Sequence, residues 1–164
     1  MQPITSALCT RVKQPGESDW SKLARMMKFS KATENDKLTL SAENGANIIE
    51  WCIDASFGAH PDFKSHTGAA MLFEGGTGAA QSMSTKKKLK ALRLTNAELH
   101  GVDDMLPLAL WTPLFMECQG WPADENAVFQ DNKSTMSLAN NGRKSCGKRN
   151  RDLYTRCFAV TDNV

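Results

Sequence analysis

Acidic residues at the ends of strand-like segments are the side chains in this sequence best suited to chemistry. The segment IIEWCID ends at Asp54 and the segment NAVFQD ends at Asp131. A helix expected between them carries Glu98 in its first turn. Carboxylate oxygens without cysteine or histidine partners favour Mg²⁺ or Mn²⁺. The spacing therefore predicts a divalent-cation site if the fold brings the three acids together.

A sheet with parallel neighbours would bring these acids together. A strand–helix–strand return within one sheet is normally parallel and right-handed. If the two segments are neighbours, Asp54 and Asp131 emerge at the same edge, where open α/β sheets place their sites. Glu98 reaches that edge if its helix starts near the strand ends. Clustered carboxylates repel one another unless a cation offsets them, and two metal ions about 4 Å apart can serve phosphodiester cleavage.

A purely structural interpretation of the same residues stays open. Thr95-x-x-Glu98 has the pattern of a capping box, which would satisfy backbone N–H groups at a helix start. Asp54 and Asp131 can be ordinary strand-end residues. Other candidates are better explained as surface or turn groups: His60, His66, His100, Asp103 and Asp104.

Positive charge is concentrated in two clusters, although the net charge is only +2. Such clusters beside isolated carboxylates suit a polyanionic substrate, and solvated surface lysines are the alternative. The first cluster is Lys86, Lys87, Lys88, Lys90 and Arg93, and the second is Arg143, Lys144, Lys148, Arg149 and Arg151.

The sequence predicts an α/β fold in which a meander of three antiparallel strands precedes a long helix. Apolar residues at helical spacing indicate a helix from about Asn96 to Gly120, which Pro107 and Pro113 should kink or break. Strands are expected over 37–41, 47–54, 67–73, 78–85 and 127–131. Residues 1–17 and 142–151 should be irregular, and helices should cover 19–30, 134–141 and 152–162.

Bulk properties suit one domain with an extension. The chain has 164 residues, is 41% hydrophobic and contains no apolar stretch long enough to span a membrane. Its start lacks the apolar centre of a signal peptide, so an intracellular location is expected. The five cysteines form no CxxC pair, which argues against zinc. Cys52, Cys118 and Cys157 are expected to be buried thiols in a reducing compartment.

Several motifs, in the same order and over nearly the whole chain, resemble the ribonuclease H region of copia-type retrotransposon polyproteins. Two segments upstream, Thr10-Arg11-Val12-Lys13 and Asp19-Trp20-x-Lys22-Leu23, resemble the end of the reverse transcriptase and its connection. The motifs within the region itself are Asp54-Ala55-Ser56-Phe57, His60-Pro61-Asp62, Lys64-Ser65-His66-Thr67-Gly68, Ser84-Thr85-Lys86, Ala97-Glu98-Leu99, Gly101-Val102-Asp103-Asp104, and Gln130-Asp131-Asn132 with Ser134.

This resemblance implies a ribonuclease H-like mixed sheet, with three antiparallel strands, further parallel strands and flanking helices. It implies cleavage of the RNA strand of RNA–DNA hybrids with two Mg²⁺ ions, Mn²⁺ being an alternative. The family's acids fall on Asp54, Glu98 and Asp131. Residues 1–45 correspond to the reverse transcriptase connection and 46–164 to the ribonuclease H-like domain. The partners would be the hybrid and the rest of the polyprotein, in cytoplasmic virus-like particles or the nucleus.

The chain departs from the family pattern in ways that leave two functions open. The family has a fourth aspartate in a closing helix, and the sequence ends at Val164 before such a helix, which implies a C-terminally truncated domain and marginal stability or self-association. Lys133 also stands where the family has glutamine. The chain is therefore expected to be a hybrid-cleaving domain or a catalytically inactive remnant that binds nucleic acid through Lys86, Lys87, Lys88, Arg143, Lys144, Lys148 and Arg149. An unrelated α/β interaction domain is the third reading.

Overall fold

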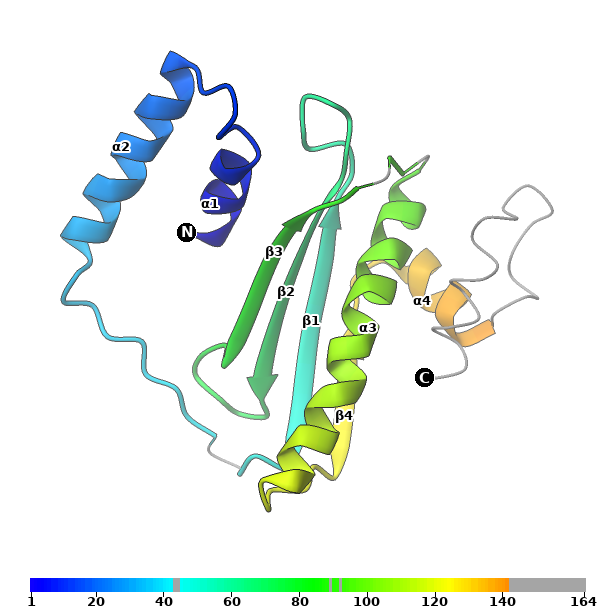
Figure 1. Ribbon diagram of the computed structural model, residues 1–164. Helices are drawn as coiled ribbons and strands as arrows, with labels where there is room; N and C mark the ends of the chain where they lie inside the picture. The colour runs from blue at the N-terminus through cyan, green and yellow to red at the C-terminus, as the bar shows by residue number, and fades with distance from the viewer. Residues whose placement is uncertain (43–44, 89, 92, 142–164) are drawn as a thin grey trace.

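Helices frame a four-stranded sheet in the computed structural model, which describes residues 1–42, 45–88, 90–91 and 93–141 (Figure 1). The described elements follow in the order α1 (Gln2–Cys9), α2 (Glu17–Ala32), β1 (Ile48–Ser56), β2 (His66–Phe73), β3 (Gln81–Lys86), α3 (Leu94–Cys118), β4 (Glu125–Phe129) and α4 (Lys133–Asn141). None of these helices is both long and apolar enough to cross a membrane.

The sheet confirms the predicted mixed α/β topology. Its strands are ordered β3-β2-β1-β4. β2 is antiparallel to both β1 and β3, and β4 is parallel to β1. Side chains of β1 alternate between a buried face with Ile49, Trp51 and Ile53 and an exposed face with Cys52 and Asp54. The alternation of a strand thus turns Asp54 away from the hydrophobic core.

Helix α3 covers the buried face of the sheet (Figure 1). Its residues Leu99, Val102 and Leu106 are buried against β1 and β2 at helical spacing. Gly101 lies over the end of β1, where an added Cβ atom would make an ordinary contact of 3.4 Å with the Cβ of Ala55. This packing sets the position of the N-terminal part of α3 relative to the end of β1.

The prolines were expected to kink or break this helix, and a break is wrong, because α3 is continuous through Pro107 and Pro113. Pro113 cannot donate a backbone hydrogen bond to the carbonyl of Ala109, four residues earlier. The side chain of Asn126 replaces that donor, with its Nδ2 2.9 Å from the Ala109 oxygen. The helix ends where expected, before Gly120, whose φ is 83°.

The N-terminal segment is more helical than predicted. Residues 2–9 form α1, and Gln2 Nε2 donates to the Ser82 carbonyl of β3 at 2.9 Å, so α1 lies beside the β3 edge (Figure 1). Helix α2 starts at Glu17, with Trp20 largely exposed. The strand predicted over 37–41 is absent from the described residues. That segment instead contacts the β2–β3 turn, where Thr77 Oγ1 donates to the Thr39 carbonyl at 3.2 Å.

The expected burial of the cysteine thiols is wrong at two positions. Cys52 and Cys118 are exposed. Cys52 lies on the face of β1 opposite α3, and Cys118 is the last residue of α3, beyond the part that packs on the sheet. Cys157, the loop at 142–151 and the helix at 152–162 lie outside the described residues.

Candidate carboxylate site

Strands β1 and β4 deliver Asp54 and Asp131 to the same end of the sheet. The parallel register pairs Cys52 with Phe129, and each aspartate lies two residues beyond that pair. Strand β4 starts and ends about two residues earlier than predicted, so Asp131 follows the strand and does not end it. The carboxyl ends of these neighbouring parallel strands form the predicted edge.

Helix α3 adds Glu98 at this end of the sheet. Its side chain is 4% exposed, and Gln130 Nε2 donates a hydrogen bond to its Oε2 at 3.2 Å. Burial raises the pKa of Glu98, the Gln130 hydrogen bond opposes this, and the charges of Asp54 and Asp131 raise it further. A backbone hydrogen bond from Ala55 also lowers it. Asp54 and Asp131 are therefore close enough to act electrostatically on Glu98.

Glu98 does not cap the helix, so the capping-box interpretation does not apply to this residue. Helix α3 begins at Leu94, its N-cap is Arg93, and that end has no side-chain capping bond. Thr95 and Glu98 therefore lie inside the helix and do not flank its start. The Glu98 carboxylate instead faces the segment that follows β4.

The chemistry of this donor set fits a hard divalent cation, although its arrangement is not closed around one. A buried carboxylate with two acidic neighbours is destabilised by their charge, and a bound cation would relieve this. In the ranges that the structure describes, no three histidine, cysteine or acidic side chains are grouped so that they could hold a metal ion. Asp54 and Asp131 are exposed, whereas Glu98 is buried.

A shallow hollow of about 560 Å³ lies beside these acids on the sheet face that α3 leaves uncovered. Asp54 and Asp131 line it together with Phe129 and Gly68. A Cβ atom at Gly68 would have no neighbour within 4 Å, so this part of the strand surface is open. A ligand on this face would reach both aspartates without passing α3.

The first basic cluster divides into residues with different roles. Lys87 is 8% exposed, and its Nζ donates to the His100 carbonyl at 2.7 Å and pairs with Asp104, so its ammonium group is engaged within the protein, and its contact with nucleic acid stays a prediction. Lys86 pairs with Asp62 at 2.9 Å, and Lys88 is exposed. Because successive residues at a strand end point to opposite faces, adjacent lysines meet different surroundings. Arg143, Lys144, Lys148 and Arg149 lie outside the described residues.

Sequence reasoning missed the role of Gln130 as the residue that holds Glu98. Its Oε1 also accepts from the backbone N–H of Asn132 at 3.2 Å. Asn132 in turn accepts from the N–H groups of Ser134 and Thr135 at 3.0 and 3.1 Å, at the start of α4. The adjacency of Gln130 and Asn132 to Asp131 was the available signal.

Comparisons with known proteins identify relatives among transposon polyproteins. No protein-family model and no solved structure matches the chain. The Ty1-DR5, Ty1-JR2 and Ty1-ER2 Gag-Pol polyproteins of Saccharomyces cerevisiae are each 32% identical to it over 114 residues, which is 68% of this chain. The match spans 6% of the length of these curated relatives. The chain is therefore a relative of copia-type LTR retrotransposon Gag-Pol polyproteins, as its motifs predicted.

Proposed function

We propose that this chain is the ribonuclease H region of a retrotransposon polyprotein and cleaves the RNA strand of RNA–DNA hybrids. The observation that carries the proposal is the buried Glu98, whose pKa is raised by burial and by the neighbouring Asp54 and Asp131. A buried acid beside two others costs stability, and catalysis is a common reason for such an arrangement. The resemblance of the motifs around all three acids supports the same reaction.

Asp54, Glu98 and Asp131 would hold two Mg²⁺ ions, and Mn²⁺ is an alternative. Bound ions of this kind supply a Lewis acid for the scissile phosphate and lower the pKa of a bound water. Gln130 keeps the Glu98 carboxylate oriented through its 3.2 Å hydrogen bond. The uncovered face of the sheet gives a duplex access to Asp54 and Asp131, and the exposed Lys88 can contact the phosphate backbone.

A strand-specific cleavage assay tests this function. The chain is incubated with a hybrid labelled on either strand, in Mg²⁺ or in a chelator, with a DNA duplex and an RNA duplex as substrate controls. We expect Mg²⁺-dependent cleavage of the RNA strand of the hybrid alone. Asp54→Asn should lower the rate by about a hundredfold or more, since it removes a proposed metal ligand. Glu34→Gln, at an exposed acid of the N-terminal segment, is the matched control and should leave the rate unchanged.

A catalytically inactive, nucleic-acid-binding domain of the same fold is the second candidate. The observation that favours it is the absence, within the described ranges, of three potential ligands arranged to hold a metal ion. This candidate predicts hybrid binding that weakens steeply with salt, without cleavage in Mg²⁺ or Mn²⁺. Cleavage that is lost in Asp54→Asn would exclude it.

A further inference from the structure

A second pocket, of about 370 Å³, lies between the N-terminal helices and the β1–β2 hairpin. Basic and hydroxyl side chains from three separate segments line much of it. They are Thr10 and Arg11 after α1, Ser18 and Lys22 of α2, and His60 of the hairpin. This lining suits an anion that accepts several hydrogen bonds.

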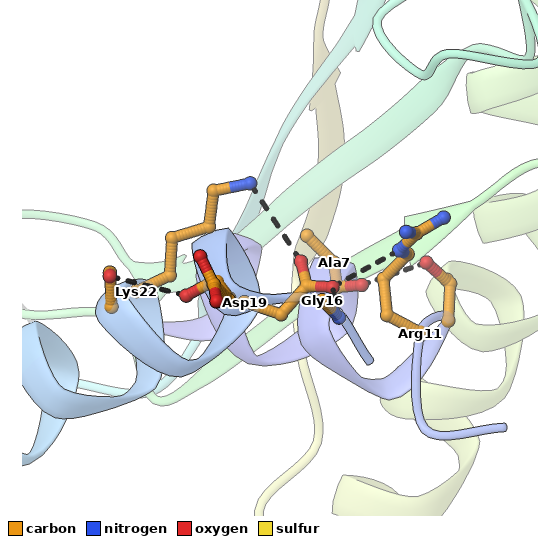
Figure 2. A network of polar contacts seen from close by, with 8 residues as sticks. Ala7, Arg11, Gly16, Asp19 and Lys22 are labelled. Atoms are coloured by element: carbon orange, nitrogen blue, oxygen red, sulfur yellow. Dashed lines mark hydrogen bonds and ion pairs between the residues drawn. The ribbon is translucent and has the colours of Figure 1, made fainter. Parts of the chain in front are cut away.

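One carboxylate, that of Asp19, contacts the two cations of this pocket, as Figure 2 shows. Asp19 Oδ2 lies 3.3 Å from Arg11 Nε, and Asp19 Oδ1 lies 4.0 Å from Lys22 Nζ. The backbone N–H of Gly16 donates to Asp19 Oδ2 at 2.9 Å. This backbone bond is the largest influence on the pKa of Asp19, which is lowered despite opposing desolvation, with Arg11 and Lys22 lowering it further. Asp19 therefore stays ionised and lies within ion-pair distance of both cations.

The two cations retain capacity for another anion. They outnumber the single carboxylate that they share, so this group of three side chains keeps one net positive charge. The side chains of Arg11 and Lys22 are 56% and 58% exposed. Arg11 contacts Asp19 through Nε, and among the described residues its terminal nitrogens have no hydrogen-bond acceptor. A guanidinium fork of this kind matches the geometry of a phosphate group.

A chain of hydrogen bonds leads from this pocket towards the carboxylate site. His60 Nε2 lies 3.0 Å from His66 Nδ1, and His66 Nε2 lies 2.6 Å from Ser84 Oγ. In the sheet, Ser84 pairs with Gly68, which pairs with Asp54. Two interstrand spacings, or roughly 10 Å, therefore separate the backbones of Ser84 and Asp54. Their side chains point to the same face, so both sites lie along one path across the sheet.

We propose that the pocket of Arg11, Lys22 and His60 binds a backbone phosphate of the nucleic-acid strand that crosses the uncovered face of the sheet. The nature of the strand rests on the proposed function, whereas the phosphate chemistry rests on the pocket itself. The N-terminal segment is then part of the substrate-binding surface, because it supplies both cations, Arg11 after α1 and Lys22 in α2. The His60–His66–Ser84 chain orders the surface between this phosphate and the carboxylates.

Hybrid binding against salt tests the proposal, measured by fluorescence anisotropy in a chelator so that no cleavage occurs. The double variant Arg11→Gln with Lys22→Gln removes both pocket cations. Its matched control, Lys13→Gln with Lys28→Gln, removes two exposed cations from the same N-terminal segment outside the pocket. The pocket variant should bind about tenfold more weakly at low salt, and its log–log salt slope should fall by about one. The control should lose less than about twofold, with its slope unchanged.

Equal behaviour of the two double variants would overturn the proposal. Failure of the unmodified chain to bind any hybrid would instead overturn the proposed function, so the two failures are distinct. If the double variant unfolds in a denaturant titration, Lys22→Gln alone replaces it, since its contact with Asp19 is the longer one. Titration of the unmodified chain with inorganic phosphate, followed by NMR of the His60 ring, gives an independent reading. Saturable shifts of His60 support an anion site, and unmoved signals contradict it.

Discussion

Gln130 Nε2 donates a 3.2 Å hydrogen bond to Oε2 of the buried Glu98, and so joins the segment after β4 to the N-terminal part of α3. The same side chain accepts from the backbone N–H of Asn132, which directly precedes α4. Glu98 is therefore the most constrained of the three acids, whereas Asp54 and Asp131 are exposed. This difference determines how each acid should respond to pH, metal and substitution.

Replacing Glu98 by glutamine should stabilise the chain in a pH-dependent way. The pKa of Glu98 is raised above its ordinary value of 4.5, so the folded chain holds this proton more tightly than the unfolded chain. The free energy of unfolding therefore falls as pH rises from about 4.5 through the raised folded pKa. Glu98→Gln removes this loss and can still accept from Gln130, so at pH 7 it should gain on the order of 1 kcal/mol. The gain in the free energy of unfolding should vanish at pH 4. Denaturant titrations of both proteins at pH 4 and pH 7 measure it. An equal gain at the two pH values would contradict the burial of an ionised Glu98.

Magnesium should stabilise the folded chain if the three acids close around it. A ligand that binds only the folded state at ten times its dissociation constant adds about 1.4 kcal/mol to the free energy of unfolding. Thermal denaturation with increasing Mg²⁺ should show this rise for the unmodified chain and for Glu34→Gln. Asp54→Asn should show little of it. An equal rise in all three proteins would mean that Mg²⁺ acts elsewhere or through ionic strength.

Lys87 and Lys88 should have opposite phenotypes although they are adjacent. Lys87→Met removes a buried donor from the His100 carbonyl and from Asp104, which should cost about 1–3 kcal/mol of stability. Lys88→Met should change stability by less than about 0.5 kcal/mol and lower the salt slope of hybrid binding by about one. Denaturant titration and anisotropy on both variants separate the two roles. Similar stability and salt slopes for the two variants would contradict a structural role for Lys87 and a binding role for Lys88.

Substitutions of Gly101 should test how closely the helix that carries Glu98 packs on the sheet. An alanine Cβ would make ordinary contacts of 3.4 Å with Ala55 and 3.5 Å with Thr67, so Gly101→Ala should fit. It should stabilise the helix by about 0.5–1 kcal/mol through the lost flexibility of glycine. Gly101→Val should cost about 1–3 kcal/mol, because its extra methyl groups overfill the contact. A destabilising alanine variant would show that α3 lies closer to the sheet than described.

The sequence was most informative where local pattern and chemistry coincide. The β-branched and aromatic run before Asp54 predicted β1, and the strand-like segment before Asp131 predicted a parallel neighbour. Together with a helix beginning near Glu98, these elements placed the three acids at one end of the sheet. Each of these inferences depends on neighbours in sequence, which is the range over which propensity acts.

Features that depend on tertiary contacts were not predictable in the same way. Pro3 suggested an irregular start, yet it lies in the first turn of α1, where proline is tolerated. Pro113 suggested a break in α3, yet Asn126 satisfies the freed carbonyl. The three lysines 86–88 suggested one uniform patch, yet alternation at the end of β3 buries the middle one. For Pro113 and Lys87, a contact distant in sequence decided the outcome.

The most direct test of the central claim is a Mg²⁺ titration of the chain followed by carboxyl-detected NMR. The side-chain carboxyl signals of Asp54, Glu98 and Asp131 should all shift and should saturate at the same Mg²⁺ concentrations, because all three are proposed to hold the same pair of ions. Glu34, exposed and distant in sequence, should not follow them. If the three signals stay unmoved, or drift without saturation as Glu34 does, these acids do not form a metal site.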